Sequence, residues 1–141
     1  MPETDRTHAV VRGWVQKAEN DLVTAAHTLK LAADAPADTV CFHAQQCVEK
    51  YLKALLVLNG RDFPKTHDIG VLLHLLPRSF DPGLSIEEQR RLSVYATVTR
   101  YPGDDEPLTL TRARQSVAIA RRVRRVVRRL LPRSAVRRPR T

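Results

Sequence analysis

Apolar residues recur at intervals of three and four along almost the whole chain, and this period constrains the fold more than any other feature. No segment shows the strict alternation of apolar and polar residues that marks a half-buried strand. With 141 residues, the chain is long enough to bury a core without disulfides or bound metals. The sequence therefore predicts an all-α protein.

Five helices are predicted from this period together with the signals that start and stop helices. Asn59 and Gly60 mark the end of the second helix, and Ser85 with Glu88 forms the capping-box pattern that opens the fourth. The expected helices cover residues 9–33, 38–59, 68–76, 85–100 and 109–131. We expect a single domain over residues 1–131 and a basic, disordered tail at 132–141.

The net charge of +9 is concentrated at the C-terminal end of the chain. Ten of the 24 Lys and Arg residues are arginines between Arg121 and Arg140, which leaves 14 basic against 15 acidic residues elsewhere. A basic end of this kind attracts phosphate backbones or another acidic surface. A solvated helix end that complements its own dipole is the other interpretation, and the sequence leaves both open.

The beginning of the chain carries Glu3, Asp5 and Arg6 before any apolar run, which is unlike a signal peptide. No uninterrupted apolar stretch approaches the length that a membrane-spanning helix needs. We therefore expect a cytoplasmic protein that has no membrane association.

The second predicted helix carries an unusual stripe of polar side chains on an otherwise apolar segment. At 3.6 residues per turn its members fall within roughly 80° of one another. This polar stripe consists of His43, Gln46, Lys50 and Lys53. Apolar residues border it on both sides, with Phe42, Leu56 and Val57 along one edge. An imidazole, an amide and two cations can grip a phosphate or nucleotide, but such a framed face also suits a subunit interface, and burial of that edge is the argument for a homodimer.

Asp21 lies only roughly 20° from Trp14 on the helical wheel, so this carboxylate is at the edge of a buried seam and needs a partner. Arg100, His43 or Lys50 can supply one. The pairing can serve a ligand site or be a purely structural ion pair.

The acidic run at residues 104–106 is a weak candidate for a divalent-cation site, since adjacent loop carboxylates usually face water. We expect neither a metal nor a cofactor.

Several of these segments, in this order and spacing, resemble the HEPN family, the nucleotide-binding domain named for higher eukaryotes and prokaryotes. They are Ala18-Glu-Asn-Asp21-Leu22, His43-Ala-Gln-Gln46 with Glu49-Lys50 and Leu52-Lys53-Ala54, Lys65-Thr-His67-Asp68, and Arg100-Tyr101-Pro102. The resemblance implies an antiparallel bundle of four to five helices that usually forms a homodimer, and an association with nucleotides or RNA. Members are often partners of minimal nucleotidyltransferases in two-component, toxin–antitoxin-like systems, and some are ribonuclease toxins.

The ribonuclease branch of the family relies on an Arg followed, after four to six residues, by a His near the C-terminal helices. Here the corresponding positions after Arg100 are Asp105, Glu106 and Pro107, so the general acid or base is missing. Arg61 and His67 have that spacing, but they lie in the link that follows the second helix. We therefore expect a binding module rather than an enzyme.

Two alternatives remain open at this stage. One is a metal-independent ribonuclease toxin that uses Arg100 or Arg61 with His43 or His67. The other is a purely structural dimerisation module without a ligand. The candidate ligand-binding residues are Asp21, His43, Gln46, Lys50, Lys53, Lys65, His67, Arg100 and Tyr101.

Overall fold

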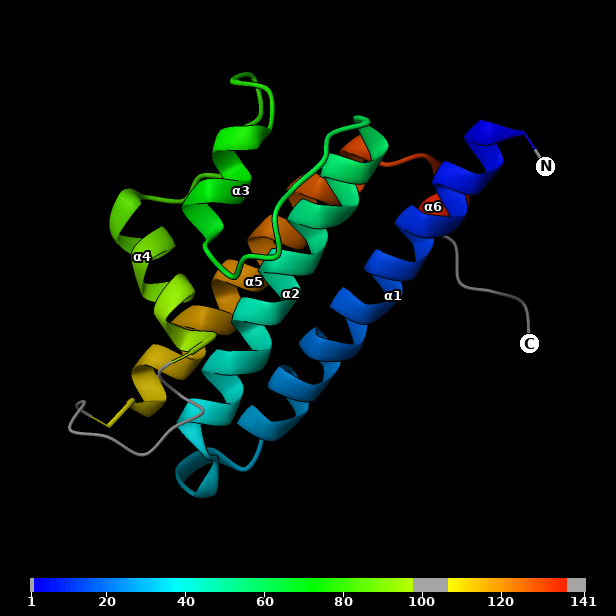
Figure 1. Ribbon diagram of the computed structural model, residues 1–141. Coiled ribbons are helices and arrows are strands. Elements are labelled where there is room, and N and C mark those ends of the chain that lie inside the picture. The colour runs from blue at the N-terminus through cyan, green and yellow to red at the C-terminus, as the bar shows by residue number, and fades with distance from the viewer. Residues whose placement is uncertain (1, 98–106, 137–141) are drawn as a thin grey trace, which may run out of the picture.

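The computed structural model describes residues 2–97 and 107–136, and every regular element in these ranges is a helix (Figure 1). This confirms the prediction of an all-α protein. The long helices are α1 (Glu3–Leu29), α2 (Ala37–Leu58) and α5 (Leu110–Leu130). The shorter elements are a 3₁₀ turn at Ala32–Asp34, α3 (Ile69–Leu75), α4 (Ile86–Tyr95) and α6 (Arg133–Val136).

The three long helices lie side by side, with α2 between α1 and α5 (Figure 1). Helices α1 and α2 are antiparallel because the short 3₁₀ connection returns the chain directly. Helix α5 runs in the same direction as α2, because α3 and α4 bring the chain back along the flank of the bundle before α5 begins (Figure 1). This arrangement places the C-terminal arginines of α5 beside the middle and end of α2.

The predicted boundaries of the second, third and fifth helices agree with the structure to within one residue, whereas those of the first and fourth helices do not. Helix α1 spans Glu3–Leu29 instead of 9–33, and α4 ends at Tyr95 instead of near residue 100. Helix α1 begins at Glu3, because Pro2 is accommodated at the N-cap and Glu3 and Asp5 complement the dipole of the first turn. At the end of α2 and the start of α4, the signals that the sequence predicts are present in the structure. Gly60 follows α2 with a positive φ of 65°, a conformation that glycine adopts without strain, and Ser85 and Glu88 form the capping box of α4.

The C-terminal segment is more ordered than the sequence indicates. From Pro132 we expect disorder, but Arg133–Val136 forms α6, and Ala135 is only 2% exposed because α6 packs against α1. The Nη1 of Arg12 donates to the carbonyl of Ser134 at 3.3 Å, and the Nη2 of Arg128 donates to that of Val136 at 3.4 Å. Two arginine side chains therefore hold this short helix, and only residues 137–141 of the expected tail lie outside the described residues.

The core is formed mainly by α2, whose side chains are buried on most of its circumference. Tyr51, Leu52 and Leu56 are fully buried, together with Val11 and Val123 from the neighbouring helices. The expectation that Leu56 covers a partner chain is therefore wrong, because Leu56 belongs to the core of its own subunit. No helix in the described ranges is long and apolar enough to cross a membrane.

Candidate functional site

Asp21 joins α1 to the polar stripe of α2. Its Oδ1 lies 2.8 Å from Nδ1 of His43, and its Oδ2 lies 2.6 Å from Nζ of Lys50. The Asp21 residue is 8% exposed, whereas the side chains of His43 and Lys50 are 27% and 22% exposed. Two of the three partners expected for Asp21 therefore contact it together, while Arg100 and Tyr101 lie outside the described residues.

The Asp21–His43 contact has the form of a carboxylate that orients an imidazole. When Nδ1 carries the proton and donates to Asp21, Nε2 of His43 is left as an acceptor. An imidazole held in this way is suited to accept a proton or a hydrogen bond from a bound group. Lys50 beside it balances the charge of Asp21, so the trio by itself carries no surplus positive charge.

A second cluster surrounds the carboxylate of Glu49, which is only 4% exposed. Its Oε1 accepts from Nδ1 of His67 at 2.7 Å and from Nε2 of Gln45 at 3.1 Å, and its Oε2 accepts from Nζ of Lys53 at 3.1 Å. The Nε2 of Gln46 donates to Oε1 of Gln45 at 2.6 Å. This cluster ties the link after α2 to the helix and occupies three of the predicted ligand-binding side chains.

Lys53 is also enclosed by two rings. Its Nζ lies 5.5 Å from the ring centroid of Trp14 and 5.6 Å from that of Phe63, distances at which cations are attracted to aromatic faces. With its side chain 9% exposed, Lys53 is a buried structural cation. Lys65, by contrast, is exposed on the link between α2 and α3.

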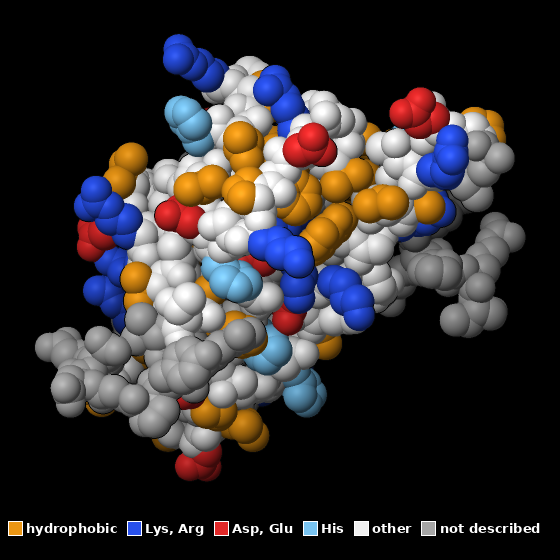
Figure 2. Space-filling view, viewed as in Figure 1, with side chains coloured by type: hydrophobic (Ala, Val, Ile, Leu, Met, Phe, Trp, Pro, Cys, Tyr) orange, Lys and Arg blue, Asp and Glu red, His pale blue; other side chains and the backbone are white. Residues whose placement is uncertain are grey.

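Figure 2 shows the face of the molecule seen in Figure 1, where Lys, Arg, Asp, Glu and His side chains are scattered among hydrophobic ones. No single continuous basic field covers the described residues of this face. The mixture agrees with the pairing described above, in which the cations of the polar stripe are matched by Asp21 and Glu49. An anionic ligand on the polar stripe has to compete with these carboxylates.

A third cluster, centred on Glu19 of α1, is absent from the sequence-based expectations. The Oε1 of Glu19 accepts from the hydroxyl of Tyr51, from Nε of Arg124 at 2.6 Å and from Nη1 of Arg128 at 3.1 Å. Burial disfavours the charged carboxylate, but the hydrogen bonds from Tyr51 and Arg124 outweigh this effect, and the pKa of Glu19 is lowered. The sequence carries one signal of this cluster. Arg124 and Arg128 lie four residues apart, on the same side of α5, and each follows a buried valine, Val123 or Val127.

Two arginines of the basic C-terminal end are thus paired with Glu19, whereas other arginines of α5 are not paired with a carboxylate of the described residues. Four arginines are exposed, lie within roughly 80° of one another around the helix, and span about 22 Å along it. This arginine stripe consists of Arg114, Arg121, Arg125 and Arg129. None of the four has an acidic partner within the described part of the chain. Such a row is a surface for polyanions.

Metal-ligating side chains do not gather in the same way. Within residues 2–97 and 107–136, no group of three or more His, Cys, Asp or Glu side chains is placed to hold an ion. The candidate acidic run at 104–106 lies outside these ranges.

The described residues form a small all-helical domain in which the long helix α5 is rich in arginine. A family model described as the HEPN domain matches residues 11–130, which is most of the chain. The protein belongs to the HEPN family, and this confirms the resemblance carried by its motifs. Membership supports a general association with nucleotides or RNA.

The fold also has a solved counterpart. The chain is similar to TT1696 from Thermus thermophilus, a crystal structure, with 27% sequence identity and a TM-score of 0.69. The similarity covers 84% of this chain and 96% of the Thermus chain. No curated protein matches the sequence.

Proposed function

We propose that the protein is a non-catalytic HEPN module that binds RNA through α5. In this proposal it acts in the cytoplasm as a homodimer and as the partner of a minimal nucleotidyltransferase in a toxin–antitoxin-like pair. The observation that carries the RNA-binding part is the arginine stripe, whose four guanidinium groups are exposed and lack acidic partners among the described residues. Phosphates of a nucleic acid supply the missing negative charges.

The surroundings of the two candidate histidines support a binding role over catalysis. His43 contacts Asp21 and His67 contacts Glu49, and neither carboxylate is paired with an arginine in the described residues. A metal-independent ribonuclease needs an arginine and a histidine that converge on one phosphate. The sequence after Arg100 lacks the histidine at the family spacing.

Neutralising the arginine stripe is expected to weaken RNA binding. In an Arg114→Gln, Arg121→Gln, Arg125→Gln variant, we expect the affinity for a fluorescent single-stranded RNA to fall by roughly 10- to 100-fold. The slope of log affinity against log salt should become shallower by about 0.7 for each phosphate that is no longer neutralised. Fluorescence anisotropy at several salt concentrations measures both quantities.

The matched control removes three exposed cations from α1 and its C-cap, as Arg6→Gln, Lys17→Gln, Lys30→Gln, and should bind within about twofold of the wild type. Equal losses in the two variants would reduce the effect to net charge and count against the stripe. The same RNA, incubated in EDTA to exclude metal-dependent contaminants, should stay intact. Cleavage that disappears on Arg100→Ala or His67→Ala would instead establish the ribonuclease alternative.

The partner is testable separately. Co-expression with a minimal nucleotidyltransferase encoded beside this chain is expected to yield one complex that co-elutes in size-exclusion chromatography. Alone, the protein should scatter light as a dimer of its 16.0 kDa chain. A dimer that binds neither RNA nor the nucleotidyltransferase would favour the purely structural alternative, and a monomer would contradict the homodimer.

A further inference from the structure

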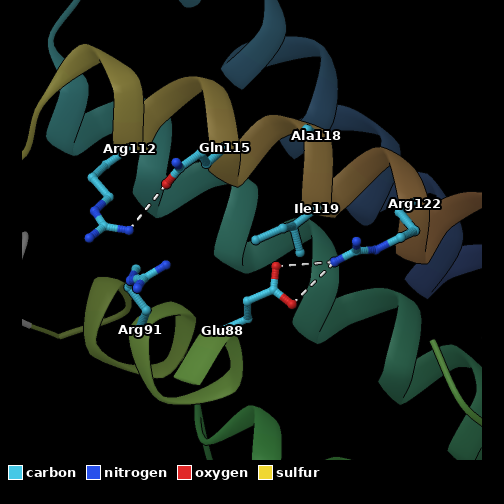
Figure 3. A pocket seen from close by; sticks show the side chains of 7 residues that line it. All are labelled: Glu88, Arg91, Arg112, Gln115, Ala118, Ile119 and Arg122. Carbon is cyan, nitrogen blue, oxygen red and sulfur yellow. Dashed lines mark hydrogen bonds and ion pairs between the residues drawn. The ribbon is translucent and has the colours of Figure 1, made fainter. Parts of the chain in front are cut away.

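A pocket lies between α4 and α5, away from Asp21 and Glu49, and its position matters because it borders the arginine stripe. Figure 3 shows the side chains of Arg91 and Glu88 rising from α4 toward those of Arg112, Gln115 and Arg122 on α5. Its volume is about 330 Å³, at the lower end of the range of small-ligand sites. Neither the polar stripe nor the Glu19 cluster contributes to its lining.

The lining of this arginine pocket carries a surplus of positive charge. Three arginines face one carboxylate, that of Glu88, so the formal charge of the lining is +2. Glu88 is already engaged, because its Oε1 accepts from the backbone N–H of Ser85 at 2.9 Å and its Oε2 lies 3.2 Å from Nη2 of Arg122. The backbone hydrogen bond from Ser85, with the nearby Arg122, also lowers the pKa of Glu88. The carboxylate is therefore matched by Arg122 and leaves two arginines over.

Those two arginines, Arg91 and Arg112, retain most of their donors. Arg112 donates through Nη1 to the amide oxygen of Gln115 at 3.2 Å, a neutral partner. Arg91 pairs with Glu87 at 2.5 Å, but the Glu87 side chain is 80% exposed, so water screens this pair. Each guanidinium has five N–H donors, and an anion between α4 and α5 is within the reach of both helices.

The chemistry of the lining favours a phosphate over a base. Sites that bind a nucleobase offer an aromatic or broad apolar face for stacking, and none of the seven described lining residues is aromatic. Guanidinium groups bind phosphate oxygens through paired, charge-assisted hydrogen bonds. The pocket therefore suits a phosphate whose base and sugar extend outside it.

The pocket continues directly into the arginine stripe. On the helical wheel of α5, Arg122 and Gln115 lie roughly 20° and 40° beyond Arg129, on the edge of the stripe that faces α4. A strand following the exposed arginines thus passes the mouth of the pocket. We propose that the arginine pocket seats one phosphate of an RNA strand whose neighbouring phosphates lie along the arginine stripe. This inference rests on the proposed RNA binding and adds the position of one specific contact.

An Arg91→Gln, Arg112→Gln variant tests the proposal without disturbing the Arg122–Glu88 pair. We expect about a tenfold loss of affinity for single-stranded RNA, and a salt slope shallower by about 0.7. The control, Lys17→Gln, Lys30→Gln, removes the same charge from exposed positions of α1 and its C-cap, and should bind within about twofold of the wild type. Circular dichroism and urea unfolding establish that both variants keep the fold.

Two RNAs of one sequence, with a 5′-phosphate or a 5′-hydroxyl, identify the source of the phosphate. If the strand end occupies the pocket, the wild type prefers the 5′-phosphate and the pocket variant loses this preference. If an internal phosphodiester occupies it, both RNAs bind alike and both weaken in the variant. If the wild type binds RNA and the affinity of the pocket variant is within twofold of the wild-type affinity, the pocket proposal is overturned but the proposed function is not. A wild type that does not bind RNA overturns the proposed function, and the pocket proposal with it.

Discussion

Replacing Glu49 with alanine is expected to lower the free energy of unfolding by about 3–5 kcal/mol, among the largest effects of any single substitution in this protein. Glu49 is the acceptor at the centre of a cluster that includes Lys53, His67 and Gln45. Its removal leaves the Lys53 ammonium, whose side chain is only 9% exposed, without a counter-charge. An uncompensated buried charge costs far more than the net value of the pair that it leaves.

The residues around Lys53 keep its ammonium group from being solvated by water. The rings of Trp14 and Phe63 lie on its ammonium group, and their attraction for a cation compensates only part of the missing carboxylate. His67, on the link between α2 and α3, is left without its carboxylate acceptor at the same time, so the damage extends to the packing of that link. Loss of native structure is therefore expected to begin there.

Urea unfolding followed by circular dichroism measures this change. A Glu49→Leu, Lys53→Met double variant should be more stable than Glu49→Ala, because replacing both charges by apolar groups removes the uncompensated cation. The control is Glu87→Ala, which deletes an ion pair whose carboxylate is 80% exposed and should cost less than about 0.5 kcal/mol. A Glu49→Ala variant that loses less than about 1 kcal/mol would show that Lys53 finds water or another partner.

The helices were predictable from the sequence because their signals are local. The apolar period, the Asn59-Gly60 stop and the Ser85–Glu88 capping box each act within a few residues, and all operate in the structure. The prediction of a disordered tail was wrong at residues 133–136 for the opposite reason. The composition there indicates disorder, but α6 is held by Arg12 and Arg128, of which Arg12 lies far from it in sequence.

The candidate site was predictable only in part. Helical spacing identified the polar stripe, and the contact of Asp21 with His43 and Lys50 followed from the need of a carboxylate at a buried edge for a partner. Helical spacing did not reveal that the side chains of Gln46 and Lys53 are buried. A helical wheel of α2 alone does not show which neighbouring segment covers each side of the helix. The Glu19 cluster joins α1, α2 and α5, so its members are separated by up to 109 positions.

The surroundings of the C-terminal arginines also depend on contacts between residues that are far apart in the sequence. Composition treats them as one basic block, but in the structure the arginines of α5 have different surroundings. Arg124 and Arg128 neutralise Glu19, Arg122 pairs with Glu88, and the arginine stripe remains exposed. Of these three groups, the stripe is available to a polyanion without breaking an ion pair among the described residues. The net charge of the C-terminal end therefore overestimates how many arginines are available to bind a polyanion.

The Glu19 cluster leads to the second large effect, which depends on pH. Glu19→Gln is expected to lower the free energy of unfolding by about 2 kcal/mol at pH 7, because one carboxylate accepts hydrogen bonds from Tyr51, Arg124 and Arg128. The Glu19 side chain is 23% exposed and those of Arg124 and Arg128 are 37% and 26% exposed, so water screens part of this interaction. The expected loss is accordingly smaller than at Glu49.

The sign of the pH dependence follows from the lowered pKa of Glu19, whose usual value is 4.5. In the folded protein the carboxylate stays charged at pH values where the unfolded chain already takes up a proton. The unfolded state therefore binds more protons in this window, and stability rises with pH there. The contribution of Glu19 is fully present above about pH 4.5 and is lost as the pH falls through the lower, folded value.

Urea unfolding of the wild type and of Glu19→Gln, repeated from pH 7 down to pH 3, measures this difference. The two proteins should differ by about 2 kcal/mol at pH 7 and approach each other progressively as the pH falls below the usual value of 4.5, because the contribution of the charged carboxylate is lost in that direction. Tyr51→Phe is the comparison variant, because it removes one of the donors that lower the pKa of Glu19 but keeps Glu19 and both arginines. A smaller acid-dependent difference should therefore remain in this variant. A difference between wild type and Glu19→Gln that stays constant across this range would mean that the cluster acts through packing rather than through the charge of Glu19.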